Sequence, residues 1–210
     1  MNNKRQNTIA TIVVFLFGCV LFYVGTDGFR AFTAETARVN QLITEQPQFP
    51  PVTFEDSNGR IYPFSEFENK YVFITFMYTA CTSVCWQLEM NMGEVYKQIP
   101  EKHIGDDIVF LSISFDPETD DPATLNKYKD YFKADGETWR MATIPNQQEL
   151  DLLLEKFGVI VIPDEYGGFA HNSAFYVVDK QGTLIDVLDF TKPQEASEIV
   201  VTLLENDGGE

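Results

Sequence analysis

Two cysteines, four residues apart, are the residues of this chain whose types and spacing most clearly permit chemistry. Cys81 and Cys85 follow an apolar run, residues 71–78, whose β-branched and aromatic content predicts a buried strand. A helix is predicted directly after them from the apolar positions Leu88, Met92, Val95 and Ile99. Residues four apart lie on one helical face, and a helix N-terminus favours a thiolate. The pair therefore suits a soft metal ion or a reversible disulfide.

A histidine and an aspartate are candidates to complete a metal site. His171 lies in a loop predicted over residues 159–172, and Gly167 and Gly168 before it predict enough flexibility to carry the imidazole toward the thiols. Two thiolates and one imidazole suit Cu(I), and oxidised copper could take a further oxygen ligand, either water or Asp116, which is otherwise a candidate neighbour of the site. A loop histidine held by a hydrogen bond is the competing interpretation, and the residue pattern alone leaves both open.

Other uses of the cysteine pair find less support in the sequence. A structural disulfide between Cys81 and Cys85 would close a very small loop and add little stability. A structural zinc site needs four protein ligands, so it would have to use both cysteines and both histidines after residue 25. His103 lies in a polar turn beyond the far end of the predicted cysteine helix, and we expect it to be a solvated loop residue.

The start of the chain predicts a membrane anchor. Residues 8–25 carry no charge, and as a helix they would span roughly 27 Å, close to the hydrocarbon thickness of a bilayer. Lys4 and Arg5 before them predict a cytoplasmic N-terminus and an extracytoplasmic body. A cleaved signal peptide and a lipoprotein signal with lipidation at Cys19 are the alternatives. No A-x-A-like site follows, and Phe17 is bulky for a lipobox, so a retained anchor is favoured.

The 210 residues are enough for one globular domain and an extension. The changes in composition along the sequence predict five segments. They are a cytoplasmic N-terminus at 1–7, a transmembrane anchor at 8–25, a polar tether at 26–50, a folded domain at 51–205 and a tail at 206–210.

Turn and cap signals divide the folded domain into strands and helices. Asn58-Gly59 between apolar runs predicts a hairpin, and further core strands are predicted at 108–115, 139–144, 173–179 and 183–190. Helix starts are predicted at Asp121, at Asn146 with Glu149 in a capping box, and at Thr191. This order indicates a three-layer α/β fold. Active sites in such folds lie at the carboxyl ends of strands, which places Cys81 and Asp116 on one rim.

The charge of the chain excludes some partners. The net charge is −17, and the part after residue 25 carries 13 basic against 32 acidic side chains, because only Lys4 and Arg5 precede it. A domain with this much negative charge repels phosphate backbones and anionic lipid head groups. We therefore expect no nucleic-acid partner. Three cysteines in 210 residues also exclude a disulfide-stapled scaffold.

Three motifs in this order resemble the SCO/SenC family. They are T-x-C-x-x-x-C with Cys81 and Cys85, S-F-D-P-E-T-D at 114–120, and H-N-S-A-F-Y-V-V-D starting at His171. The resemblance implies a thioredoxin-like three-layer fold with a central mixed sheet, behind a single N-terminal transmembrane helix in a bacterial cell membrane. It implies Cys81, Cys85 and His171 as ligands of copper, as Cu(I) or Cu(II). It also implies copper delivery to the dinuclear centre of cytochrome c oxidase subunit II. We expect a monomer.

One residue departs from the family pattern, and the mode of action stays open. Trp86 stands where the family usually has proline after the second cysteine, and core packing is its simpler interpretation. The chain is then either a metallochaperone without enzymatic activity or a thiol-disulfide reductase with Cys81 attacking and Cys85 resolving. A peroxidase of the same fold is disfavoured, because no proline lies in the strand before Cys81.

Overall fold

The computed structural model describes residues 2–25, 33–81, 84–165 and 168–207, which divide into two compact units, Met1–Thr44 and Glu45–Glu210. The first unit contains helix α1 (Asn2–Gly25) and α2 (Ala34–Glu45, whose last residue begins the second unit). Within α1, Thr8–Gly25 is long and apolar enough to cross a membrane, a test that an N-terminal signal sequence also meets. The predicted single apolar helix is thus confirmed.

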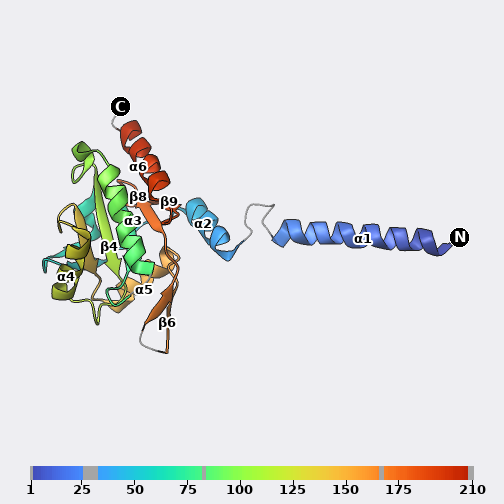
Figure 1. The fold of residues 1–210 in the computed structure, drawn as a ribbon, viewed down its shortest axis with the longest axis horizontal. Coiled ribbons are helices and arrows are strands. Elements are labelled where there is room, and N and C mark those ends of the chain that lie inside the picture. Colours follow the sequence, from blue (N-terminus) through green and yellow to red (C-terminus); the bar gives the residue numbers. More distant parts are fainter. Residues whose placement is uncertain (1, 26–32, 82–83, 166–167, 208–210) are drawn as a thin grey trace. The chain divides into compact units, whose positions relative to one another are not determined.

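The second unit is built on a seven-stranded mixed sheet with the strand order β2-β1-β5-β4-β3-β8-β9 (Figure 1). The strands are β1 (Thr53–Asp56), β2 (Ile61–Pro63), β3 (Tyr71–Met77), β4 (Ile108–Ser114), β5 (Trp139–Thr143), β8 (Phe175–Val178) and β9 (Leu184–Leu188). The central strands β3, β4 and β5 are parallel, and the remaining pairs are antiparallel. The predicted mixed α/β sheet is confirmed.

Helices cover both faces of this sheet. They are α3 (Val84–Gln98), α4 (Pro122–Phe132), α5 (Gln147–Lys156) and α6 (Pro193–Asp207), with 3-10 turns at Phe64–Phe67 and Glu101–His103. Helix α3 packs between α4 and α6, as Figure 1 shows. Because β3-α3-β4 and β4-α4-β5 are successive crossovers in the same direction, α3 and α4 lie on one face.

Alternate side chains of the central strand β3 supply the two halves of the core. The ring of Phe73 lies 5.1 Å from that of Phe110, which in turn contacts Tyr96 of α3. Phe76, three residues after Phe73, points to the opposite face of the sheet, where its ring lies 6.3 Å from that of Phe157 at the end of α5. All seven residues of β3 are buried, so this strand is held in place on both faces and fixes where the cysteine segment begins.

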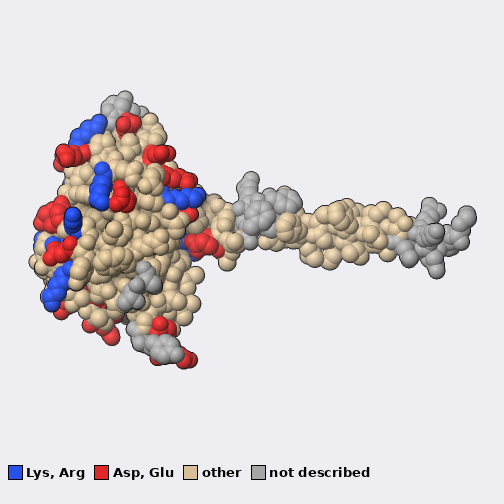
Figure 2. Space-filling view, in the orientation of Figure 1, with Lys and Arg blue, Asp and Glu red and all other residues tan. Residues whose placement is uncertain are grey.

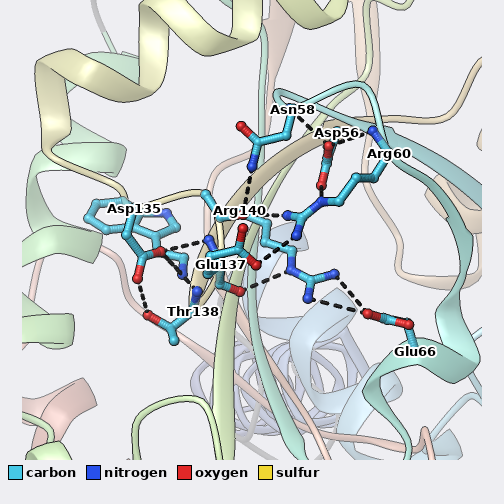
Figure 3. A network of polar contacts seen from close by, with 10 residues as sticks. Asp56, Asn58, Arg60, Glu66, Asp135, Glu137, Thr138 and Arg140 are labelled. Carbon is cyan, nitrogen blue, oxygen red and sulfur yellow. Dashed lines mark hydrogen bonds and ion pairs between the residues drawn. The ribbon is translucent and has the colours of Figure 1, made fainter.

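The predicted Asn-Gly hairpin is formed by β1 and β2, and a polar corner fastens it to the loop before β5 (Figure 3). The buried carboxylate of Asp56 accepts the backbone N–H groups of Asn58 and Arg60 and the Arg60 Nε–H at 2.7 Å. The same guanidinium reaches Glu137 Oε2 at 2.6 Å and the carbonyl of Gly136. An ion pair with one buried and hydrogen-bonded partner of this kind holds two loops in register.

The helix caps follow the predictions in two of three cases. Asp121 accepts the Thr124 N–H at 2.7 Å, and Asn146 accepts the Gln148 N–H at 3.0 Å. The capping box at Asn146 is only half formed. Its second bond would have the Glu149 side chain accept the backbone N–H of Asn146, but Glu149 accepts the N–H of Thr53 instead. The predicted cap at Thr191 is wrong: α6 begins at Pro193, and the Thr191 hydroxyl donates to Asp189 at 2.6 Å.

The segment predicted as a loop over residues 159–172 contains a second, two-stranded sheet. Strands β6 (Val161–Pro163) and β7 (Phe169–His171) pair antiparallel, with Val161 opposite His171. The run Val159 to Pro163 has the β-branched composition of a strand, but its polar, glycine-containing continuation obscured that signal. Gly167, which we predicted to add flexibility, lies outside the described residues.

Candidate metal centre

The cysteine segment occupies the turn between the end of β3 and the start of α3. Cys81 follows a backbone turn in which its N–H donates to the Tyr78 carbonyl at 3.3 Å. Cys85 lies in the first turn of α3, and its N–H donates to the sulfur of Cys81 at 3.3 Å. Both side chains are buried, with 7% of Cys81 and 0% of Cys85 exposed. The helix N-terminus therefore directs a backbone donor at the first sulfur, which favours a thiolate at Cys81.

The β6–β7 hairpin brings the predicted histidine to this pair. His171 is the last residue of β7, and its Nε2 lies 3.3 Å from the Sγ of Cys85. The ligand atoms of Cys81, Cys85 and His171 all lie within 4.8 Å of one another. The structure thus brings together the three residues that the sequence singled out, although a strand rather than a flexible loop positions the imidazole.

The tautomer of His171 leaves Nε2, the nitrogen that faces the cysteines, available to bind a metal. Its Nδ1 lies 3.0 Å from the carbonyl oxygen of Asn172, which can only accept, so Nδ1 carries the proton. The lone pair of Nε2 then faces the Cys85 sulfur. Binding a metal through Nε2 while Nδ1–H donates to a carbonyl is the common arrangement for protein imidazoles.

Aromatic side chains enclose the imidazole and tie its hairpin to the end of β3. The Tyr78 hydroxyl accepts the Phe169 N–H at 3.2 Å, and the two rings meet edge to face at 5.1 Å. The ring of Phe115, directly after β4, lies 5.0 Å from the imidazole. These rings replace water around His171 and restrict where it can move.

Burial favours the neutral forms of Cys85 and His171. The pKa of the Cys85 thiol is raised, first by burial and then by its contact with Cys81. Burial lowers the pKa of His171, although its bond to the Asn172 carbonyl works in the opposite direction. The prediction that the helix N-terminus favours a thiolate is wrong for Cys85, because loss of solvent outweighs the helix dipole there. A bound cation would compensate for the charge that burial opposes.

The acid that meets the cysteine segment is Asp120, which the sequence analysis did not single out. Its buried carboxyl group accepts the Thr79 N–H at 2.9 Å, the Thr79 hydroxyl, and the Ser114 hydroxyl at 2.5 Å. Asp116 is not in the three-residue group, and its backbone N–H donates to the Ser114 hydroxyl at 3.1 Å. Asp116 as a further oxygen ligand stays a prediction.

A second buried acid, Glu89, lies one helical turn after Cys85 and was also missed. One of its oxygens accepts the Ser112 hydroxyl at 2.9 Å, and Ser112 in turn accepts the indole N–H of Trp139. The other oxygen has no hydrogen-bond partner among the described residues, and burial raises the pKa of Glu89 to about 8. Its place on the apolar stripe of α3, between Cys85 and Met92, was the available signal.

Two expectations about residues around the site are corrected. His103 is buried rather than solvated, and its Nδ1 lies 2.6 Å from a carboxylate oxygen of Asp107. Trp86 is 44% exposed rather than part of the core, and its ring packs on Phe132 and Tyr131 of α4. Trp86 thus points from the first turn of α3 toward α4, on the surface.

Comparison with known proteins gives consistent results. The SCO1/SenC family model matches residues 41–205. A SCO1 protein homolog of Bacillus subtilis is 26% identical over 137 residues, which cover 64% of this chain and 70% of that protein. A SCO2-like protein of Rickettsia typhi is 24% identical over 136 residues, or 62% and 64% of the two chains.

Solved structures share the fold. Copper-bound ScoI of Bradyrhizobium japonicum has a TM-score of 0.61 at 23% identity, covering 73% of this chain and 97% of that one. Copper-bound yeast Sco1 has a TM-score of 0.63 at 22% identity, covering 76% and 90%. BsSco, a member of the Sco family of cytochrome c oxidase assembly proteins with a disulfide switch, has a TM-score of 0.61 at 23% identity, covering 75% and 95%. These likenesses confirm the predicted thioredoxin-like fold, and with the family match they show that the chain belongs to the SCO1/SenC family.

Proposed function

We propose that this chain is a membrane-anchored copper-binding assembly factor that delivers copper to the dinuclear copper centre of cytochrome c oxidase subunit II. The observation that carries the proposal is the convergence of two thiols and one imidazole nitrogen within 4.8 Å. Two structurally similar Sco proteins are copper-bound, and a third belongs to a family of cytochrome c oxidase assembly proteins.

The donor set fits copper as a cargo. Cys81 and Cys85 would bind Cu(I) through sulfur and His171 through Nε2, a soft, low-coordinate set that hard cations such as Mg²⁺ do not prefer. Because the Cys85 thiol holds its proton at neutral pH, binding releases that proton, and release of copper takes a proton up again. Thiols of the acceptor would replace Cys81 and Cys85 in turn while His171 leaves with its hairpin.

The proposed location follows from the first helix. Thr8–Gly25 would anchor the chain, with residues 1–7 in the cytoplasm and the copper-binding domain outside the bacterial cell membrane. Figure 2 shows acidic and basic side chains side by side around the edge of the visible face of the domain. The excess of acidic residues in the chain is typical of a surface that stays in water beside an anionic bilayer.

A transfer experiment tests this function. The full chain loaded with Cu(I) is mixed with the copper-free, reduced soluble domain of subunit II. Ferricyanide is then added as a one-electron oxidant, and formation of the dinuclear centre is followed by the absorption spectrum of its oxidised form. We expect the spectrum to develop with the wild-type chain but not with Cys81→Ala. Delivery would be contradicted if the copper stayed on the chain, or if free copper formed the dinuclear centre equally fast.

A thiol-disulfide reductase is the second candidate, and the hydrogen bond from the Cys85 N–H to the Cys81 sulfur favours it. Cys81 as thiolate would attack a target disulfide, releasing one target thiolate and forming a mixed disulfide. Cys85 would then lose its proton and attack Cys81, which releases the second target thiolate and leaves a Cys81–Cys85 disulfide. His171→Ala separates the two functions, because it should abolish copper delivery and leave stoichiometric reduction of an oxidised target.

A further inference from the structure

A groove of about 470 Å³ lies beside the candidate metal centre. Its walls come from three places, which are the segment after β4, the exposed side of α5, and the β6–β7 hairpin. The apolar lining consists of Phe115, Pro117, Leu154, Val159, Val161, Pro163 and Phe169. Such a lining suits an apolar side chain of a partner rather than a purely polar ligand.

The groove and the candidate metal centre share a wall. Phe115 lines the groove while its ring lies 5.0 Å from the imidazole of His171. Phe169 lines it too, and its ring lies 5.6 Å from that of Phe115. Val161, a third lining residue, is the strand partner of His171. A molecule seated in the groove would therefore touch the residues that hold the imidazole.

The rim of the groove is acidic. Asp116, Glu118, Asp151 and Glu155 line it together with Gln147, and the lining includes no lysine, arginine or histidine. None of the four carboxylates forms an ion pair with another described residue, although Asp151 accepts a hydrogen bond from Gln147. Elsewhere in the domain, acids such as Asp56 and Glu66 do pair with arginines. The rim thus keeps an uncompensated negative potential beside an apolar floor.

We propose that this groove is the docking site for a basic segment of the protein that exchanges copper with the chain, with one apolar side chain of that segment packed against the wall that Phe115 and Phe169 form together. This proposal rests on the proposed function, because it names the partner surface for the same copper site. Charge complementarity determines the chemistry of the occupant, since lysine or arginine side chains would pair with the four carboxylates.

A single metal ion is a poorer occupant of the groove than a peptide. The described residues contain one group of cysteine, histidine and acidic side chains whose ligand atoms converge closely enough to share an ion, and that group is Cys81, Cys85 and His171. The four carboxylates of the rim do not belong to it. They are instead spread along the groove, which suits several separate cationic groups on an extended segment.

The test uses a labelled peptide, acetyl-Lys-Lys-Phe-Lys-Lys-amide, and the full chain in a neutral detergent. Binding is followed by fluorescence anisotropy at about 20 mM and about 150 mM salt, because exposed charge pairs weaken as the Debye length shortens. Peptides with glutamine for lysine or serine for phenylalanine serve as controls. The groove variant is Asp151→Lys with Glu155→Lys, and the matched variant with the same charge change is Glu198→Lys with Glu205→Lys on α6.

We expect the peptide to bind the wild-type chain and the α6 variant, and to lose affinity about tenfold or more on the groove variant. Both control peptides should bind more weakly than the parent peptide. Equal binding to the two variants, or no preference for phenylalanine, would overturn the proposal. Copper stoichiometry is measured on the same samples. Normal copper binding by the groove variant shows that it is folded, whereas absence of copper from the wild type would count against the proposed function and not against the groove.

Discussion

The Nε2 of His171 lies 3.3 Å from the Sγ of Cys85, although 86 residues separate them along the chain. Three structural features produce this contact. The buried strand β3 fixes the cysteine turn, the Asn172 carbonyl fixes the imidazole tautomer, and the ring of Phe115 supports the imidazole from the end of β4. These contacts restrict the three side chains to one arrangement, which favours binding because little side-chain freedom remains to be lost.

The Tyr78 hydroxyl should act on copper affinity through the hairpin that carries His171. Tyr78→Phe removes the acceptor for the Phe169 N–H, so we expect the free energy of unfolding to fall by about 1 kcal/mol and copper affinity to fall several-fold. Competition against a chromogenic Cu(I) chelator measures the affinity. Tyr131→Phe is the control, because Tyr131 is 66% exposed, and its affinity should be unchanged. Equal affinities in both variants would show that this bond does not position the histidine.

Asp120 and Asp121 are neighbours with separable roles. Asp120→Ala leaves the Thr79 N–H and two hydroxyl groups without their acceptor beside the cysteine turn. We expect a loss of about 2–4 kcal/mol in urea unfolding together with weaker copper binding. Asp121→Ala removes only the cap of α4 and should leave copper binding intact. If Asp120→Ala binds copper as tightly as the wild type, the carboxyl group does not hold the cysteine turn.

Glu89 should make the stability of the domain depend on pH. Its pKa is raised from 4.5 to about 8 by burial, so the folded chain binds this proton more tightly than the unfolded chain does. The contribution of Glu89 is therefore fully present below about pH 4.5. It is lost as pH rises through about 8, at up to about 1.4 kcal/mol per pH unit. Glu89→Gln should remove this slope, so the variant should gain stability relative to the wild type between these pH values. Parallel pH profiles from chemical unfolding would refute the assignment.

Trp86 should matter for stability and not for copper. It is half exposed and packs on Phe132 and Tyr131, so Trp86→Ala should lower the free energy of unfolding by about 1–2 kcal/mol. Copper affinity should stay within about twofold of the wild type, since the ring points toward α4. A large drop in affinity without a matching loss of stability would instead place the indole among the residues that shape the site.

The sequence was most informative where local chemistry decides structure. The central strands, the Asn-Gly hairpin and the caps at Asp121 and Asn146 follow from short-range patterns that the tertiary fold does not oppose. Cys81 and Cys85 were singled out because cysteine is rare in this chain and the pair follows a predicted strand, whereas the residue pattern left the role of His171 open and only the family resemblance implied it as a ligand.

The remaining features depend on contacts between distant segments. The β6–β7 hairpin is stabilised partly by Tyr78, 91 residues before Phe169, and no local pattern reports that contact. Burial of His103 and Glu89 is likewise a tertiary effect, because both residue types are more often exposed. The raised pKa of Cys85 could not be predicted from its position in a helix, since its burial determines the sign.

Copper binding to the reduced full chain, beside Cys81→Ala and His171→Ala, tests the central claim most directly. Stoichiometry and affinity are measured by chelator competition, and the sulfur-to-copper charge-transfer band reports the oxidised ion. We predict one tightly bound copper per chain, with tight binding lost in both variants, because each variant removes one of three converging ligand atoms. Weak binding that is the same with and without His171 would contradict the three-ligand site and leave the dithiol reductase as the better account of this chain.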